Sequence, residues 1–484
     1  MPRPGPLTPP AEGASLRLVE AVARRTASRM ARLRRRLSPR GRQSAGAEGG
    51  ALGALLAGVE AKLGTLEPGA LCCVLHGPDL RGWLSEAELW SEVAASARRG
   101  DTRRLFDLVS RSEHLVALLP SGRIDARFPA RALRLARRRL KAAGADLAAL
   151  LCGLHLTFPV ARGSAMSRAA AAFEAILEAR PDPEQGRPAH RIDLGCVAGP
   201  AGPLGIEVGR AARVRVRWDG AFLEIASRGR RSFVPRAALF VRGALGPGGP
   251  LVRRPRIPGT PILLAPEVVS SPRALVVGRD VPDLGDRLAA AMRLLAIAWP
   301  QAHREIVRRT AMVVPVREKG LVSYSLAARP GVSFINVTGK PTLTLADDLL
   351  HETAHHLLHD AQEIERYLVR GPDTEEVQAF ESPWRGSRRP LHGILHGVFT
   401  FHFRAELFTR LLRERARRPR LLRPLLSEAD VRFLRRERRR ELSMMARSLR
   451  DLGQARSAGL LTPAGRRLVA GLIAWSRRLA GGLR

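Results

Sequence analysis

The spacing of apolar residues divides the chain into helical and strand-like parts. From residue 51 to about residue 180, Leu, Ala and Val recur every three or four positions, which predicts helices. Residues 191–257 alternate instead, and Asp219-Gly220 separates the alternating runs 213–217 and 222–225, which predicts a β-hairpin. Short apolar runs continue to residue 277. The pattern then predicts a helix over 281–310, strands at 312–316 and 333–337, and mostly helices from residue 342 onward.

These patterns predict an α+β fold that is mainly helical. With 484 residues the chain is long enough for more than one domain. Residues 1–50 are predicted to be a basic, partly disordered arm with a helix over 14–37, and residues 51–190 a helical N-terminal domain. A small antiparallel β-rich segment over 191–260 and a mostly helical C-terminal domain over 261–484 would follow, with linker-like stretches at 38–50 and 181–188.

The net charge of +36 at first indicates a nucleic-acid-binding protein. Of the 81 basic residues, however, 77 are arginine, and asparagine occurs once. This composition is typical of a G/C-rich coding sequence, and the arginines are spread along the whole chain rather than gathered in one stripe. We therefore predict no specific nucleic-acid partner. The charge can still attract an acidic peptide over long range.

Other features of the composition point to a cytoplasmic protein. The longest apolar run, residues 147–160, is interrupted by His155 and Pro159 and is too short to span a bilayer. The N-terminus lacks the apolar core of a signal peptide, and the four cysteines show no Cys-x-x-Cys spacing. We predict neither a membrane partner nor a disulfide framework.

The sharpest chemical signal is the HExxH motif formed by His351, Glu352 and His355. Residues four apart lie on one face of a helix, so both imidazoles can bind a single metal ion. No helix breaker occurs between Thr344 and Asp360. The sequence therefore predicts a metal-binding helix, in which Glu352 can act on a metal-bound water or orient a ligand.

The third ligand decides which metal chemistry the site supports. The metzincin pattern fails, because Leu358 and Ala361 occupy the positions that it assigns to Gly and His. A thermolysin-like zinc peptidase would place a Glu about twenty residues after the second His, where Glu375 stands. In that hypothesis Glu352 is the general base. Glu375 also fits the acidic first turn of a new helix, which needs no metal.

A second block of histidines offers a different third ligand. His392 and His396 again lie four residues apart, before an apolar run that predicts a partly buried helix. One of these imidazoles would complete a three-ligand site with open positions, as in non-haem Fe(II) oxygenases or catalytic zinc sites. Arg385 and Arg389 nearby can bind a carboxylate of a cosubstrate. Other histidines of this region are expected to point elsewhere, namely His356, His359 and His402.

Four segments of the chain together resemble segments of a known family. In chain order they are PGVSFINV, LADDLLHETAHH, SPWRGSRRPLHGILHGVFTF and LTPAGRRLV. Together they are similar to the HExxH-motif family of Fe(II)- and 2-oxoglutarate-dependent peptide β-hydroxylases associated with ribosomally synthesised, modified peptides. The similarity covers roughly residues 260–475, and residues 363–380 depart from it. By position it implies that His351, His355 and His396 bind iron and that Arg385 and Arg389 hold 2-oxoglutarate. Glu352 would then orient a ligand.

We therefore expect an enzyme that hydroxylates a side-chain β-carbon of a peptide or small protein with Fe(II) and 2-oxoglutarate. The alternative is a zinc metallopeptidase of the HExxH type. A third hypothesis is a non-catalytic, arginine-rich binding protein whose HExxH helix is structural. The sequence leaves open the third ligand among His392, His396 and Glu375, the peptide substrate, the oligomeric state and the role of the first 190 residues.

Overall fold

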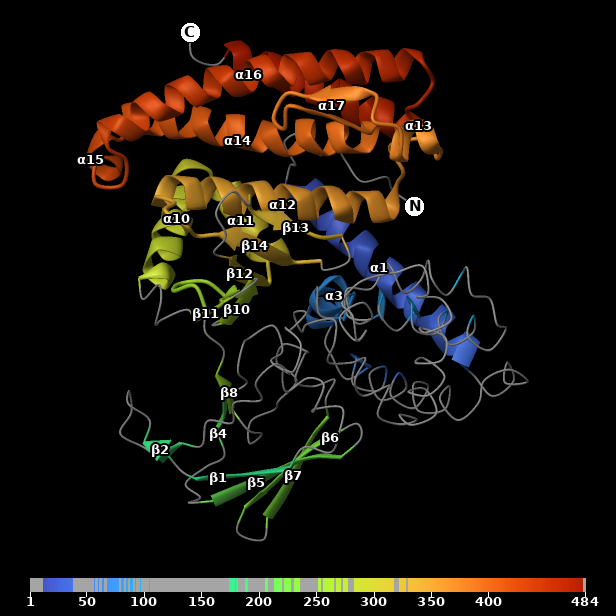
Figure 1. Cartoon of the computed structure of the whole chain (residues 1–484), viewed down its shortest axis with the longest axis vertical. Helices are drawn as coiled ribbons and strands as arrows, with labels where there is room; N and C mark the ends of the chain where they lie inside the picture. Colours follow the sequence, from blue (N-terminus) through green and yellow to red (C-terminus); the bar gives the residue numbers. More distant parts are fainter. Residues whose placement is uncertain are drawn as a thin grey trace. The chain divides into compact units, whose positions relative to one another are not determined.

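The computed structural model describes residues 12–37, parts of 56–104, strands between residues 174 and 276, and residues 256–264, 283–316, 322–327 and 330–481 (Figure 1). The chain forms two compact units. The first contains residues 1–22, 256–262 and 281–484, and the second contains residues 23–255 and 263–280. The described part is mainly helical with a small set of strands, which confirms the predicted α+β class.

A small sheet lies at the base of the first unit. Strand β12 (Met312–Val316) pairs in parallel with β14 (Val332–Asn336), and β13 (Tyr324–Ser325) pairs antiparallel with the other side of β14. Every residue of β12 and β14 is buried. The continuous apolar run at 312–316 is typical of a strand buried on both faces. The run at 333–337 also contains the buried polar residues Ser333 and Asn336. Both predictions are confirmed.

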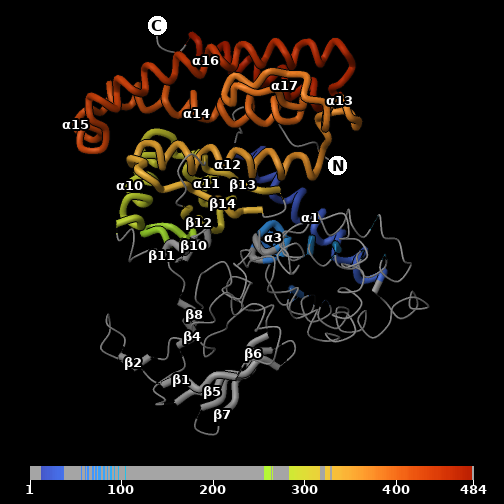
Figure 2. Tube along the Cα trace, viewed as in Figure 1, coloured from blue at the N-terminus to red at the C-terminus, as the bar shows by residue number. Residues whose placement is uncertain are grey.

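Helix α12 (Thr342–Ile364) packs on this sheet, and two further helices pack against α12. The predicted helix at 281–310 is divided into α10 (Leu284–Ala298) and α11 (Pro300–Arg309), because Pro300 starts a new helix after the extended Trp299. Helix α12 carries the HExxH motif and lies between the sheet and α14 (Leu391–Arg417), as Figures 1 and 2 show. Buried on both sides, α12 brings its polar residues either to the sheet or to α14.

Two further helices complete the layer above α14. Helix α16 (Glu428–Ser457) begins with a capping box between Ser427 and Asp430, and α17 (Pro463–Gly481) packs beside it on α14 (Figure 2). A single helical turn, α15 (Pro419–Leu422), joins α14 to α16. None of the helices in the described part of the chain combines the length and apolarity needed to span a bilayer.

The LTPAG segment, which begins α17, packs against the residues that follow α12. The Thr462 amide donates to the carbonyl of Tyr367 at 3.1 Å, and the Thr462 hydroxyl accepts from the amide of Gly465 at 3.0 Å, which caps α17. A Cβ at Gly465 would lie only 1.9 Å from the Tyr367 carbonyl oxygen. Glycine is therefore needed at this close approach, and the predicted helix restart at Pro463 is confirmed.

A short connection links α12 to α14. It contains the helical turn α13 (Pro372–Glu375) and a hairpin formed by β15 (Phe380–Ser382) and β16 (Ser387–Arg389). The hairpin turn holds Trp384 and Arg385 and closes at Gly386, whose φ of 62° favours glycine. The SPWRGS segment is therefore a tight turn that lies beside the start of α14.

Helix α1 (Glu12–Leu37) confirms the helix predicted over 14–37. Leu18 and Val22 are fully buried, and the buried Ser15 donates to Glu305 of α11 at 2.6 Å. An apolar stripe therefore runs between the arginines of α1. Residues 1–11 and 38–50, which were assigned to the predicted basic arm, lie outside the described residues.

The second unit contains the strands of the middle region. Its sheet has the order β1 (Glu174–Glu178), β5 (Arg213–Asp219), β6 (Phe222–Ser227), β7 (Arg230–Pro235), all antiparallel. Asp219 pairs with Phe222, which confirms the hairpin predicted from Asp-Gly. Strand β1 lies in a stretch that was predicted to be helical, and this prediction is wrong for residues 174–178. A short apolar run fits a strand as well as a helix, and here it pairs with β5.

The remaining elements of the second unit are short. They are α3 (Pro68–His76), β2 (Arg180–Pro181), β3 (Pro188–Ala189), β4 (Gly205–Glu207), β8 (Leu251–Arg253), β9 (Leu263–Leu264), β10 (Glu267–Ser270) and β11 (Arg273–Val276). Most of the helices predicted between residues 51 and 180 lie outside the described residues.

Candidate metal centre

Helix α12 presents a row of three imidazoles toward α14. His351, His355 and His359 are each four residues apart, so they follow one face of the helix. The ring centroids of His351 and His355 are 5.0 Å apart, and those of His355 and His359 are 6.1 Å apart. The HExxH pair is therefore two members of a longer HxxxHxxxH row.

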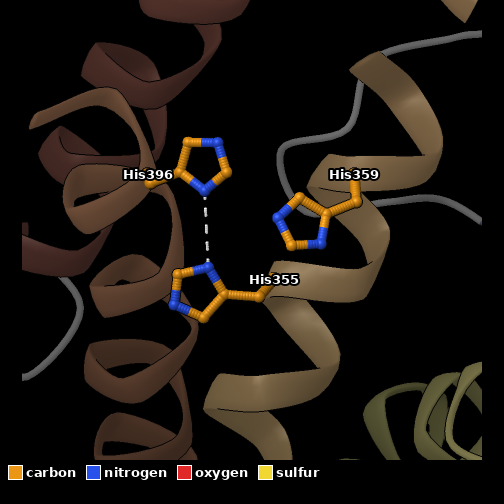
Figure 3. Close-up of side chains that lie close together, drawn as sticks. All are labelled: His355, His359 and His396. Carbon is orange, nitrogen blue, oxygen red and sulfur yellow. Dashed lines mark hydrogen bonds between the residues drawn. The ribbon is translucent and has the colours of Figure 1, made fainter. Parts of the chain in front are cut away.

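Helix α14 adds a fourth imidazole from across the helix interface. The Nδ1 atom of His396 lies 3.5 Å from Nδ1 of His355, and the His396 ring centroid lies 5.3 Å from that of His359. One nitrogen each of His355, His359 and His396 lies within 4.8 Å of the other two, and Figure 3 shows these nitrogens turned toward a common space. Nitrogens bound to one tetrahedral metal at about 2.1 Å would be roughly 3.4 Å apart. The His355–His396 pair has that spacing at 3.5 Å, and His359 lies within 4.8 Å of both.

Gln362 fixes which nitrogen His396 offers. Its amide oxygen lies 3.2 Å from Nε2 of His396, and this oxygen accepts a hydrogen bond from the tautomer that carries its proton on Nε2. The Nδ1 atom of the neutral ring then keeps its lone pair, directed at His355. A second group that orients an imidazole in this way is typical of metal-binding histidines.

The protonation of the cluster also suits a metal. Burial lowers the pKa of His351, of His355 and of His396 well below the ordinary histidine value. The positive charge of Arg385 acts in the same direction on His351 and His355. All three rings are therefore neutral at pH 7 and have a lone pair for coordination.

His351 lies at the aromatic end of the row. Its ring packs edge-on against Phe401, with centroids 4.8 Å apart, and its buried Nδ1 has no hydrogen-bond partner. Phe401 stacks on Trp384 at 4.4 Å with nearly parallel rings, and the Trp384 indole donates to Glu441 at 2.8 Å. A Cβ at Gly397 would meet the Trp384 ring at 3.2 Å, so the small residue makes room for the stack.

An ionic network holds the same end of the site together. Arg404 of α14 pairs with Asp347 of α12 through two bonds of 2.7 and 2.9 Å, and with Glu441 of α16 at 3.2 Å. Its guanidinium also lies 4.8 Å from the centre of the Phe401 ring. Three helices are thereby joined around the aromatic wall. Because Arg404 has two acidic partners, it is not available to bind a cosubstrate.

Glu352, the acid of the HExxH motif, is almost completely buried, with 1% exposure. Burial raises the pKa of its carboxyl to about 8, with a smaller contribution from Asp348 in the same direction. Its Oε2 atom is buried and has no hydrogen-bond partner. Asp348 itself pairs with Lys340 and accepts from Ser323 at 2.6 Å.

The two arginines predicted to hold a carboxylate are both exposed. Arg385 lies in the turn of the β15–β16 hairpin, and its positive charge contributes to the lowered pKa of both His351 and His355. Arg389 ends β16, and a Cβ at Gly393 of α14 would lie 3.5 Å from the Arg389 Cβ.

The other predicted ligands lie outside the close cluster. His392 is exposed, with its ring centroid 6.4 Å from that of His396, and Glu375 is exposed on α13. His359, which was expected to point elsewhere, belongs to the cluster. The repeat of the four-residue spacing from His351 through His355 could have indicated it. His356 and His402 do have internal hydrogen-bond partners, as expected.

No family model matches the chain, and no curated protein matches it significantly.

Proposed function

We propose that the chain is an Fe(II)- and 2-oxoglutarate-dependent enzyme that hydroxylates a side-chain β-carbon of a peptide substrate. The observation that carries this proposal is the cluster of neutral imidazoles contributed by α12 and α14. Imidazole nitrogen suits iron and zinc, and a set of three protein ligands leaves positions open for other molecules. The similarity of the HExxH and SPWRGS segments to the peptide β-hydroxylases favours iron.

The residues present fit such a metal. His355 and His396 would hold it from two helices, with a third imidazole from His351 or His359, which flank His355. The buried Nδ1 of His351 without a partner is one polar atom that a bound group could satisfy. When bound, Fe(II) and 2-oxoglutarate would supply the oxidation by O2 that replaces a C–H bond with C–OH and converts 2-oxoglutarate to succinate and CO2.

The protein would contribute orientation and charge. Gln362 would hold the His396 ring with its lone pair toward the metal. Arg385 would pair with a carboxylate of 2-oxoglutarate, since it is exposed and has no acidic partner among the described residues. Phe401 and Trp384 would form an apolar wall that keeps water from the His351 end of the site.

Anaerobic reconstitution of the full chain tests this proposal without a known substrate. We expect Fe(II) and 2-oxoglutarate together to produce a visible charge-transfer band, which requires chelation of the iron by the keto acid. Exposure to O2 should bleach the band and form succinate. With a genuine peptide substrate, the product should gain one oxygen atom. Absence of both the band and succinate would overturn the proposal.

The zinc metallopeptidase gives the opposite result for one variant. In a peptidase, Glu352 would be the general base, so Glu352→Gln should abolish peptide cleavage while the protein keeps its zinc. In a hydroxylase, the same variant should still form the charge-transfer band with Fe(II) and 2-oxoglutarate. Chelator-sensitive cleavage of a peptide library by the wild type, lost in Glu352→Gln, would support the peptidase.

A further inference from the structure

We propose that His359 is a metal ligand and that the metal lies one helical turn beyond the position that the HExxH motif indicates. The ion would be held by His355, His359 and His396, while His351 would line the site without binding the metal. This assignment rests on the proposed metal-dependent function. It changes which chemical groups surround the ion.

The geometry of α12 allows one metal ion to bind either His351 and His355 or His355 and His359. Four residues of α-helix advance about 6 Å, so His351 and His359 are separated by about 12 Å along the helix. One ion bound through nitrogens at about 2.1 Å cannot reach both rings and also His355. His355 lies in the middle and belongs to either pair. The metal therefore uses the first pair of the row or the second pair.

His396 favours the second pair. Its ring centroid lies 5.3 Å from that of His359, and one nitrogen of each of these rings lies within 4.8 Å of the other and of His355. Among the described residues, His355, His359 and His396 form the group of three potential ligands whose ligand atoms all lie within 4.8 Å of one another. Figure 3 shows the nitrogens of His355, His359 and His396 facing one another across the interface of the two helices.

Gln362 strengthens this choice. It lies on α12 three residues after His359 and bonds to Nε2 of His396 at 3.2 Å. The His396 ring is thereby held beside the later turn of α12 with Nδ1 available. By contrast, the aromatic contacts of His351 are made with Phe401 as well as His355, toward the Trp384 stack.

With the ligand pair His355–His359, no carboxylate follows the first ligand as Glu352 follows His351 in the HExxH motif. In HExxH the acid follows the first ligand, but in the pair His355–His359 that position is His356. His356 is 3% exposed and bonds to Ser333 and to the amide of Gly331 in the sheet region. As with His351 in place of His359, the ion would have three neutral ligands and keep its full charge, and the positive charge of Arg385 acts on His355. Such a centre favours a dianionic chelating ligand, the class to which 2-oxoglutarate belongs.

Titration of histidine variants with Co(II) tests the assignment directly. The full chain would be titrated with Co(II) as the wild type and as the variants His359→Ala and His351→Ala. His392→Ala is the control, because the His392 ring is exposed on α14 near His396 and does not belong to the cluster. We expect His359→Ala to weaken Co(II) affinity by about tenfold or more, and the other two variants to stay within about threefold of wild type. Loss of affinity in His351→Ala with wild-type affinity in His359→Ala would overturn the proposal.

A cysteine variant keeps the test valid if His359→Ala does not fold. His359→Cys retains a potential ligand, and its Co(II) complex should show a thiolate-to-cobalt charge-transfer band that the wild type lacks. His351→Cys should show none. A band in His351→Cys, or no band in a folded His359→Cys that still binds cobalt, contradicts the assignment.

The outcomes separate this inference from the proposed function. If the cobalt results assign His359 as a ligand and no charge-transfer band forms with Fe(II) and 2-oxoglutarate, the ligand set stands and the hydroxylase proposal fails. If the wild type forms that band and succinate while His359→Ala binds metal normally, the hydroxylase proposal stands and the ligand set fails. A wild-type chain that binds no cobalt overturns both.

Discussion

His356 and His359 lie within one turn of α12, yet their rings face opposite surroundings. Toward the sheet, His356 accepts from the Gly331 amide and bonds to Ser333 at 3.1 Å, so both of its nitrogens have partners. Toward α14, His359 meets the rings of His355 and His396. One side of the helix thus places hydrogen-bonding groups against complementary groups of the protein, and the other places imidazoles against one another.

The same contrast extends along the helix. On the sheet side, Asp360 pairs with Arg309, and Thr353 bonds to Thr310 at 3.0 Å. On the α14 side, burial keeps the rings of His355 and His396 neutral, and nitrogens of His355, His359 and His396 face one space. Polar groups paired with complementary groups of the protein stabilise the fold. Imidazole nitrogens that converge on one space indicate where an external ligand binds, and the two sides can be tested separately.

The largest effect is expected at the buried ion cluster on the sheet side. Arg309 pairs with Asp360 and with Glu305 at 2.9 Å, and all three side chains are buried. Arg309→Met would remove the buried cation that Asp360 and Glu305 share, leaving Glu305 with Arg308 and Ser15, which should lower the free energy of unfolding by about 3–5 kcal/mol. Urea unfolding measures this change. A loss below about 1 kcal/mol would show that this side does not stabilise the fold as argued.

His402 of α14 should make stability depend on pH. Burial lowers the pKa of its imidazole to about 4, although the carbonyls of Val398 and Leu472 lie at 2.7 and 3.1 Å. Between pH 6.5 and 4 the unfolded chain binds this proton and the folded chain does not, so the free energy of unfolding falls as the pH falls. The loss from this group approaches about 3 kcal/mol at pH 4.

Comparison with a variant isolates this contribution. In His402→Phe the ring cannot be protonated, so unfolding free energies measured between pH 7 and pH 4 should fall less steeply than in the wild type, by the equivalent of one proton. Identical slopes in the two proteins would mean that His402 is protonated in the folded state. The prediction would then be wrong.

A smaller effect is expected at His356. His356→Ala removes two hydrogen bonds and leaves Ser333 and the Gly331 amide without this partner, which should cost about 2 kcal/mol of stability. Because the ring faces the sheet, Co(II) affinity of the folded variant should stay within about threefold of wild type. Weaker metal binding in His356→Ala than in His359→Ala would reverse the comparison between the two sides.

The sequence predicted the elements of the site better than their contacts. Four-residue spacing and the lack of breakers placed His351 and His355 on a helix, and α12 confirms that helix. The spacing could not show that His359 meets His396, because this depends on how α12 crosses α14. It could not show either that Gln362, an unremarkable polar residue in the sequence, orients His396.

Close approaches between distant segments were also beyond the sequence patterns. Gly397 of α14 makes room for the Trp384 ring of the SPWRGS segment, and Gly465 of the LTPAG segment makes room for the Tyr367 carbonyl, which explains the small residue at each position. The apolar stripe of α1 was hidden among arginines, so its packing through Ser15 on α11 was missed. Periodicity specifies an element and its faces, whereas these contacts are set by tertiary packing.

The central claim is that the imidazoles between α12 and α14 form a metal site, and His355 belongs to every arrangement of that site. Co(II) titration of wild type and His355→Ala, with spectroscopic detection of bound metal, tests it most directly. We expect one cobalt ion per wild-type chain and affinity at least about 100-fold weaker in His355→Ala, with similar folding stability without metal. Equal cobalt binding by the two folded proteins would contradict the account.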